Sequence, residues 1–319
     1  MDRDRTRTHP PRGVRLGRTA AGLGLAAALS LAVADHALAQ TPATTPGPPA
    51  PEASKAPNTG RVSISAGVDW TSAYFFRGIK QETEDLILQP YGEVTFKLVE
   101  NAGALTALSL TGGIWNSLQT GATGSDSPTA TDPKVWYELD GYFKLSAVFL
   151  EDLTASVIYT AYMSPNNVFN TVQEVAVGFA YNDAKLLGPF AVNPSVLIAF
   201  EFDGQADAGA DKGIYAQLGI APGYTFIADS AYPLTLSVPL AVGLSLSDYY
   251  EFGTGSDDTF GYFSAGATLS VPLAFIPAEF GKWLVKAGVQ VLFLGDNLKA
   301  VNDGDDLQVI GTIGLAFAY

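Results

Sequence analysis

Apolar and polar residues alternate along the chain from Arg61 onward. In the first such segment, residues 62–70 with the sequence VSISAGVDW, apolar residues hold the even positions and polar residues or glycine hold the odd ones. Strict alternation of this kind is typical of a β-strand with one apolar and one polar face. Because the pattern recurs along the rest of the sequence, we expect an all-β protein.

Twelve segments carry this pattern. They cover residues 62–75, 87–99, 104–116, 135–148, 153–164, 172–182, 190–203, 213–226, 233–247, 260–272, 282–295 and 307–319. Most run for about 10–13 residues, which suits a tilted membrane crossing, whereas ordinary strands average about 5–6 residues. After residue 39, no continuous apolar run reaches the roughly 18–20 residues of a membrane-spanning helix. Residues 61–319 are therefore predicted to form an antiparallel, up-and-down transmembrane β-barrel of about 12 strands.

The gaps between the segments differ in length and polarity. Long polar gaps cover residues 121–133, 203–211, 248–258 and 296–306, and the last three are rich in Asp. Gaps such as 100–103 and 150–152 are short, and this contrast is typical of the outer loops and periplasmic turns of outer-membrane barrels. We expect a helical turn in the longer gap 274–281. Pro239 lies in the middle of a predicted strand, which indicates either a β-bulge or different strand boundaries.

Charged residues in the strands fall on the parity opposite the apolar set, so they are predicted to face the lumen. The candidate pore-lining residues are Asp69, Arg77, Glu93, Lys97, Glu138, Asp140, Lys144, Glu174, Glu201 and Lys286. Acidic side chains outnumber basic ones in this set, and rings of carboxylates favour cations. We therefore expect a modest cation preference.

The N-terminal region has the composition of an export signal. Six Arg residues precede an apolar run from Ala20 to Ala34, and the sequence Ala37-Leu38-Ala39 follows. This order predicts a signal peptide over residues 1–39, cleaved after Ala39 and used by the general secretory route. Residues 40–60 are rich in Pro, Ala and Thr, which predicts a disordered linker.

Composition narrows the possible functions. The chain holds 18 basic and 32 acidic residues, so nucleic acid is not an expected partner. It contains no Cys, and its two histidines, His9 and His36, lie in the predicted signal peptide. The barrel region therefore lacks the usual side chains for thiol or His-based catalysis and for zinc or haem. We expect no enzyme and no cofactor, with weak Ca²⁺ binding at acidic loops such as 302–306 as an alternative to simple solvated loops.

One stretch resembles a known family. Residues 69–81, DWTSAYFFRGIKQ, resemble the opening strand of the TorF family of porins, whose pattern is close to S-D-Y-x-F-R-G-I-S-Q. Ala73 stands where that pattern has Asp, and Lys80 stands where it has Ser. The resemblance implies an outer-membrane barrel with this motif in its first strand.

Arg77 in this motif has two interpretations. It could line the pore mouth and meet the acidic side chains of Glu82, Glu84 and Asp85. Alternatively, Arg77 and Gly78 form a turn in which the guanidinium ties down the first loop, and this structural role is the favoured one.

The last predicted strand has its own signature. Apolar residues share one face from Val309 to the final residue, Tyr319. The segment is similar to the C-terminal strand that the barrel assembly machinery reads, with Phe317 and Tyr319 as the assembly signal. We expect this strand to close the barrel against the first one.

Aromatic residues concentrate toward the ends of the predicted strands. They include Trp70, Tyr74, Trp115, Trp136, Tyr162, Tyr249, Tyr250, Phe260, Tyr262 and Trp283. Rings with an apolar body and a polar tip suit a membrane–water interface, so two aromatic girdles are predicted. A track for stacking carbohydrates is the alternative.

The leading functional hypothesis is a porin-like channel for passive diffusion of small solutes across a Gram-negative outer membrane. Its expected partners are outer-membrane lipid, lipopolysaccharide, the barrel assembly machinery and the solutes. The alternative is a structural or adhesive barrel with a plugged lumen. An outer-membrane hydrolase is the least favoured hypothesis.

Overall fold

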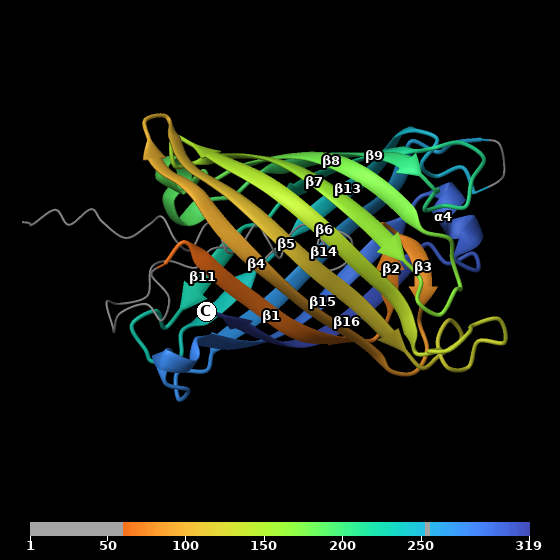
Figure 1. The fold of residues 1–319 in the computed structure, drawn as a ribbon, viewed down its shortest axis with the longest axis horizontal. Helices are drawn as coiled ribbons and strands as arrows, with labels where there is room; N and C mark the ends of the chain where they lie inside the picture. The colour runs from red at the N-terminus through yellow and green to blue at the C-terminus, as the bar shows by residue number, and fades with distance from the viewer. Residues whose placement is uncertain (1–59, 253–255) are drawn as a thin grey trace, which may run out of the picture.

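The computed structural model describes residues 60–252 and 256–319. The predicted signal peptide, 1–39, and all but the last residue of the predicted linker, 40–60, lie outside the described residues. The described chain forms one antiparallel barrel, whose strands run at a tilt along its long axis (Figure 1). No helix among the described residues is long and apolar enough to cross a membrane.

The barrel wall is built from the alternating segments. Its strands are β1 (Val62–Thr71), β4 (Ile87–Ala102), β5 (Leu105–Gln119), β6 (Trp136–Phe149), β7 (Leu153–Met163), β8 (Val172–Tyr181), β9 (Ser195–Asp203), β10 (Ile214–Ile220), β11 (Gly223–Phe226), β12 (Leu234–Ser237), β13 (Leu240–Ser247), β14 (Phe260–Pro272), β15 (Lys282–Leu294) and β16 (Leu307–Ala318). When β10–β11 and β12–β13 are each taken as one interrupted crossing, the wall has the twelve predicted crossings. Consecutive crossings pair antiparallel, and β1 pairs with β16 to close the ring. This is the fold of outer-membrane barrels.

Prolines cause the two interruptions. Pro222 separates β10 from β11, and Pro239 separates β12 from β13 at the same level of the wall. The register is unchanged across the break, because Ile220 pairs with Leu240 on one side and the same offset continues on the other. The predicted bulge is therefore wrong, and the alternative of different strand boundaries is correct. Grouping two residues that lack an N–H confines the lost ladder bonds to one place.

Short helices occupy several connections. The turn η2 (Ala278–Phe280) confirms the helical turn predicted in the gap 274–281. The sequence pattern missed α3 (Ala184–Leu187), η1 (Gly188–Phe190) and α4 (Asp296–Val301). Strand β9 consequently begins at Ser195 rather than at residue 190, because Pro189 lies in η1.

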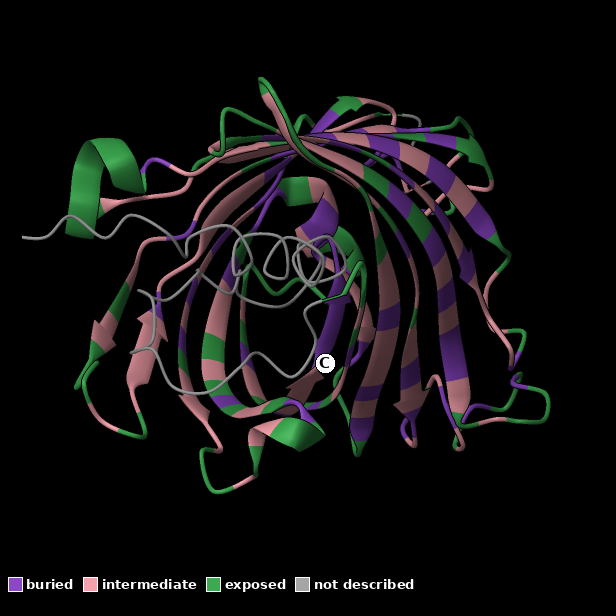
Figure 2. Cartoon of the chain, turned by 60° about the vertical axis from the view of Figure 1, so that its left-hand side comes forward, coloured by how far each residue is buried: buried purple, intermediate pink, exposed green. Residues whose placement is uncertain are grey.

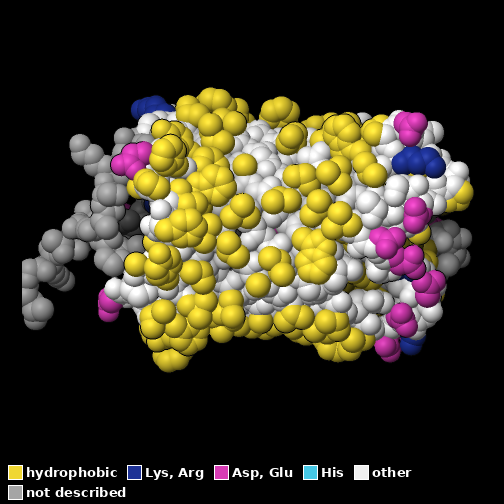
Figure 3. All heavy atoms as spheres, turned by 90° about the horizontal axis from the view of Figure 1, so that it is seen from below, with side chains coloured by type: hydrophobic (Ala, Val, Ile, Leu, Met, Phe, Trp, Pro, Cys, Tyr) yellow, Lys and Arg dark blue, Asp and Glu magenta, His cyan; other side chains and the backbone are white. Residues whose placement is uncertain are grey.

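The wall has an inverted polarity compared with that of a water-soluble protein. Buried and exposed residues alternate along the strands (Figure 2). On β6, Phe143 points outward and is 63% exposed, whereas Glu138 points inward and is 4% exposed. Hydrophobic side chains cover much of the outer surface on the face drawn in Figure 3, and acidic side chains gather mainly at the end that carries α4. The apolar face of each strand thus lies outside the barrel, as predicted.

Close tyrosine–glycine contacts help fix the register of the wall. Three inward tyrosines lie over the glycine directly opposite on the neighbouring strand: Tyr91 over Gly67, Tyr142 over Gly113, and Tyr262 over Gly243. A Cβ on Gly113 would lie 2.3 Å from the Tyr142 ring, so that position has no room for a side chain.

We predict that Gly113→Ala will destabilise the barrel. The added Cβ displaces Tyr142, whose hydroxyl donates a 3.0 Å hydrogen bond to Glu93. Overpacking of this kind lowers the free energy of unfolding by about 1–3 kcal/mol, which urea unfolding of the refolded barrel can measure. Gly141→Ala is the matched control, because the nearest atom to its added Cβ, Cε of Met163, is 3.8 Å away. Equal destabilisation by both substitutions would contradict the proposed role of the contact.

Candidate functional site in the barrel lumen

A hairpin inside the barrel carries the motif that resembles the TorF family. It consists of β2 (Tyr74–Phe76) and β3 (Ile79–Glu82), which pair only with each other (Figure 1). Strand β1 ends at Thr71, so the prediction that the first strand extends to residue 75 and contains the motif is wrong. The hydroxyl of Thr71 donates a 2.9 Å hydrogen bond to the carbonyl of Ala73, where the chain leaves the wall.

The consecutive apolar residues of β2 explain why this segment leaves the wall. Tyr74, Phe75 and Phe76 are all buried, which a wall strand with one outer and one inner face does not allow. Phe75 belongs to a core cluster with residues of β10, β14 and β15, whereas Tyr74 and Phe76 belong to another with Tyr137 and Tyr162. The hairpin therefore contacts opposite sides of the lumen. The break in alternation at Tyr74-Phe75-Phe76 was the sequence signal for it.

The hairpin turns at Arg77 and Gly78. Both residues have positive φ, 49° and 86°, as the two central residues of a type I′ hairpin turn require. A Cβ on Gly78 would lie 2.6 Å from a methyl carbon of Leu298 in α4, so close packing also demands glycine there. The turn places the Arg77 side chain in the barrel interior.

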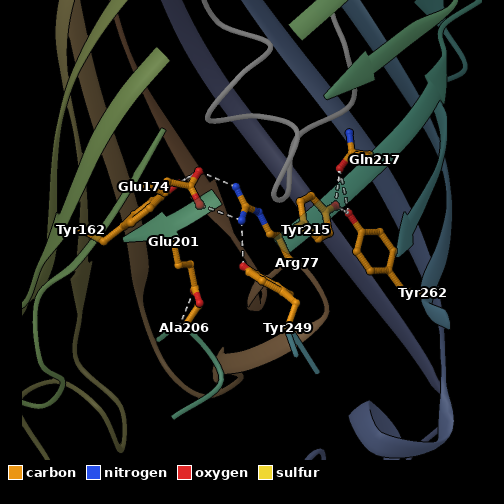
Figure 4. A network of polar contacts seen from close by, with 9 residues as sticks. All are labelled: Arg77, Tyr162, Glu174, Glu201, Ala206, Tyr215, Gln217, Tyr249 and Tyr262. Carbon is orange, nitrogen blue, oxygen red and sulfur yellow. Dashed lines mark hydrogen bonds and ion pairs between the residues drawn. The ribbon is translucent and has the colours of Figure 1, made fainter. Parts of the chain in front are cut away.

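The Arg77 guanidinium forms a two-pronged ion pair with Glu174 on β8. Nη1 and Nη2 lie 2.9 and 2.7 Å from the two carboxylate oxygens, and Nη1 also donates a 2.8 Å hydrogen bond to the hydroxyl of Tyr249 (Figure 4). Arg77 is 5% exposed and Glu174 is 3% exposed. Burial alone would lower the pKa of Arg77, but attraction to Glu174 raises that pKa well above its ordinary value. Arg77 is therefore a buried, permanently charged group with one dominant counter-ion.

Aromatic rings surround this ion pair. The guanidinium carbon lies 4.2 Å from the centroid of Tyr215, 5.0 Å from that of Phe76 and 5.3 Å from that of Tyr249. Tyr162 donates a 2.9 Å hydrogen bond to Glu174 from the other side. Cation–π attraction in a desolvated site is worth about 2 kcal/mol, so the rings add to the ion pair.

Loops at the end of the barrel that carries α4 also hold the hairpin. Asn302 donates from its amide to the carbonyl of Gly78 at 2.8 Å and accepts from the backbone N–H of Lys80 at 3.0 Å. Lys80 also forms an ion pair with Asp303. The hydroxyl of Tyr250 donates a 3.0 Å hydrogen bond to the carbonyl of Arg77. The loop proposed for Ca²⁺ thus contacts the hairpin, and among the described residues no group of three or more His, Cys, Asp or Glu is arranged to hold a metal ion.

The acidic residues that follow Arg77 are not its partners. The carboxylate of Glu82 instead accepts hydrogen bonds from the backbone N–H groups of Thr83, Glu84 and Thr123 at 2.9–3.0 Å. Glu82 therefore joins the hairpin to the loop 121–133. The less favoured interpretation, in which Arg77 meets the acidic residues that follow it, is therefore wrong. The favoured one agrees with the structure, because the guanidinium ties the first loop to the barrel interior.

The other candidate pore-lining residues lie mainly in the barrel interior. Asp69, Arg77, Glu93, Glu138, Asp140, Lys144, Glu174, Glu201 and Lys286 are each less than a tenth exposed. Lys97 is half-buried near a strand end, where it lies 2.5 Å from Glu100. These positions agree with the predicted parity, while lining of a conducting pore stays a prediction.

The interior charges use several kinds of partner. Lys286 donates a 2.9 Å hydrogen bond to Asp69, joining β15 to β1. Glu138 accepts a 2.7 Å hydrogen bond from the hydroxyl of Tyr74. Glu201 accepts from the backbone N–H groups of Ala206 and Gly213 at 2.7 and 2.8 Å. The Tyr74 bond links the hairpin to β6, two strands along the wall from Glu174 on β8.

Several predicted girdle residues are not on the outer surface. Tyr74, Tyr162, Tyr249, Tyr250 and Tyr262 are buried inside the barrel. Their hydroxyls find hydrogen-bond partners there, which lipid would not supply. The prediction that these five tyrosines belong to outer aromatic girdles is therefore wrong. Other predicted girdle residues, such as Trp70 and Phe260, are exposed.

The predicted assembly residues lie on the closing strand. The Phe317 ring packs against Trp283 with centroids 4.8 Å apart. Tyr319 exchanges two 2.8 Å backbone hydrogen bonds with Ile64. The last strand therefore closes against β1, as expected, and the assembly signal itself stays a prediction.

Comparison with known proteins finds only distant likenesses. No family model matches the chain, and no curated protein matches it. Similar solved structures include an outer membrane channel from Pseudomonas putida F1, with 14% identity over 81% of this chain and 94% of that chain and a TM-score of 0.43. The NanC porin has 10% identity over 80% and 98% of the two chains, with a TM-score of 0.37. The beta domain of the Bordetella autotransporter BrkA has 9% identity over 82% and 99%, with a TM-score of 0.37.

Likenesses at this level carry no argument about solute or activity. The barrel assignment rests on the strand pairing of this chain, and the TorF resemblance stays a prediction.

We predict that Glu174→Gln will loosen the hairpin. The substitution leaves the buried Arg77 charge without its counter-ion, which weakens the folded hairpin by about 3–5 kcal/mol. Hydrogen exchange should accelerate at residues 75–79 while the amides of β5 to β7 stay protected. Glu151→Gln is the control, because Glu151 lies on an exposed turn and its partner Lys185 in α3 is also exposed, and it should leave exchange unchanged. Unchanged exchange in the hairpin of Glu174→Gln would contradict the role of the ion pair.

Proposed function

We propose that this chain is an outer-membrane channel for small polar solutes, with the β2–β3 hairpin controlling passage. The observation that carries the proposal is the inverted polarity of the wall. Large apolar side chains such as Phe143 and Ile114 are exposed outside, while carboxylates and lysines are buried inside. Lipid accommodates such an outer surface, and a polar interior suits the transfer of hydrated solutes.

The charges of the inner wall support a preference for cations. Among the described strands of the wall, the side chains less than a tenth exposed include six acidic residues, Asp69, Glu93, Glu138, Asp140, Glu174 and Glu201, and two lysines, Lys144 and Lys286. Adding Arg77 of the hairpin still leaves an acidic excess. Carboxylate-lined passages favour cations, so we propose a modest preference of the channel for cations.

A structural barrel with a plugged lumen is the second candidate. The observation that favours it is the hairpin itself, which contacts the wall at both Glu138 and Glu174. Several tethers, including Asn302 and Tyr250, would have to release before the hairpin could move. A catalytic role has less support, because residues 61–319 contain neither His nor Cys.

Selectivity tests the charge assignment. Across a salt gradient in planar bilayers, the refolded protein should show a reversal potential whose sign indicates cation selectivity. Glu93→Gln should reduce it, because the substitution removes a buried negative charge while keeping an acceptor for Ser65, 2.8 Å away in the native protein. Glu151→Gln removes the same charge from an exposed turn and should leave the potential unchanged. Anion preference in the native protein would refute the assignment.

Cross-linking tests whether the hairpin controls passage. The chain has no cysteine, so the double variant Lys80→Cys/Asp303→Cys introduces one defined pair where the hairpin meets the loop 296–306. Joining the two thiols with a short bifunctional reagent should hold the channel in its low-conductance state, because the hairpin can no longer leave the lumen. The single variant Lys80→Cys, treated alike, serves as control. Equal conductance before and after cross-linking would place the hairpin outside the conduction path.

A further inference from the structure

The surroundings of the Arg77 guanidinium have the composition of a binding site for an organic cation. Glu174 offers both oxygens of one carboxylate, and the rings of Tyr215 and Tyr249 lie 4.2 and 5.3 Å from the guanidinium carbon. Figure 4 shows the side chain entering between Glu174 and Tyr249, with Tyr215 beside it. We call Glu174, Tyr162, Tyr215 and Tyr249 the cation cage.

None of the cage groups belongs to the hairpin. Tyr162 lies on β7, Glu174 on β8 and Tyr215 on β10, while Tyr249 lies in the connection after β13. Only the cation and the ring of Phe76 come from the hairpin. The cage is therefore a feature of the barrel, and Arg77 enters it from a separate segment.

Each half of the cage has contacts that do not involve Arg77. Tyr162 donates a 2.9 Å hydrogen bond to Glu174. The hydroxyls of Tyr215 and Tyr262 lie 2.9 Å apart, and both lie within hydrogen-bond distance of the side-chain oxygen of Gln217 (Figure 4). The Tyr215 and Tyr249 rings pack with centroids 5.0 Å apart. A site whose groups are fixed before binding loses less conformational entropy when it takes a ligand.

We propose that the cation cage binds a guanidinium group, or a similar flat organic cation, of a solute, and that Arg77 is the resident occupant that such a solute displaces. Binding at the cage does not depend on whether the barrel conducts. Displacement of the hairpin as a gating step, in contrast, rests on the proposed channel function.

The geometry favours a guanidinium over an inorganic cation. A planar fork meets both carboxylate oxygens at once and stacks on an aromatic ring, and it sheds its weakly held water more readily than an ammonium does. Anionic solutes are disfavoured, because Glu201 on β9 is the cross-strand partner of Glu174 and adds a second acidic side chain (Figure 4).

Calorimetry on an emptied cage tests the binding step. Full-length Arg77→Ala protein, refolded in detergent, is titrated with methylguanidinium and, separately, with methylurea, which has a similar shape and no charge. We expect Arg77→Ala to bind methylguanidinium at least about tenfold more tightly than methylurea, and Arg77→Ala/Glu174→Gln to lose that preference. The native protein should bind methylguanidinium more weakly than Arg77→Ala does, because Arg77 competes for the cage. Equal binding of the two compounds, or unchanged binding in the double variant, would overturn the proposal.

A second measurement uses the native sequence and does not require Arg77→Ala to fold. Methylguanidinium should accelerate hydrogen exchange at residues 75–79 of the native protein, whereas equal concentrations of methylurea or sodium chloride should not. Exchange that responds equally to all three additions, or to none, contradicts displacement of Arg77.

Conductance measurements distinguish binding at the cage from gating by the hairpin. If displacement opens the channel, methylguanidinium should raise the native conductance in planar bilayers above that in sodium chloride of equal concentration. Calorimetric binding without this rise would retain the cage and overturn the gating step alone. A native protein that never conducts under any condition would overturn the proposed channel function and leave the calorimetric test of the cage intact.

Discussion

Closure of the β-sheet into a ring is the constraint on which the rest of the structure depends. A closed barrel satisfies the backbone groups of its strands through their neighbours, so each wall strand has only two faces to assign. Alternation then sends Phe143 outward and its neighbours Tyr142 and Lys144 inward. Buried polar side chains that face inward need partners in a confined space. The paired charges, tyrosine hydroxyls and backbone contacts of the interior follow from that requirement.

Within the described residues, the β2–β3 hairpin is a segment that cannot satisfy this constraint as part of the wall. Three consecutive apolar residues at Tyr74, Phe75 and Phe76 cannot alternate between lipid and lumen. Buried against opposite sides of the interior, they give the barrel a core of the kind found in soluble proteins. The buried charge of Arg77 at the hairpin tip then needs a counter-ion inside the barrel, and Glu174 supplies it. Apolar burial thus places the hairpin, and the ion pair determines its orientation.

The sequence predicted the wall well because a period of two is a local property. All twelve crossings were located, and the inward parity of residues such as Asp69 and Glu201 follows directly from counting. The ion pair of Arg77 was not predictable in this way, because its two partners are 97 residues apart and meet only through closure of the ring. The aromatic girdles failed in part for a different reason, because they were assigned from nearness to a strand end alone. The parity of Tyr162, opposite to that of Leu153 and Val157, places its ring in the lumen, and its hydroxyl finds a partner there.

The buried charge of Arg77 is not needed to hold the hairpin tip in the lumen. A purely structural plug needs only apolar burial and backbone hydrogen bonds, which Phe75 and the Asn302 contacts already provide. A charged guanidinium adds a large desolvation penalty that its carboxylate partner must offset, so the pair contributes little net stability compared with an apolar tip of equal size. What the charge adds is dependence on one partner: without Glu174 the buried guanidinium has no counter-ion, although the Asn302 and Tyr250 contacts remain. A segment held by apolar contacts alone has no such dependence, whereas the proposed exchange at the cage weakens the hold on the tip when a flat organic cation competes for the same carboxylate.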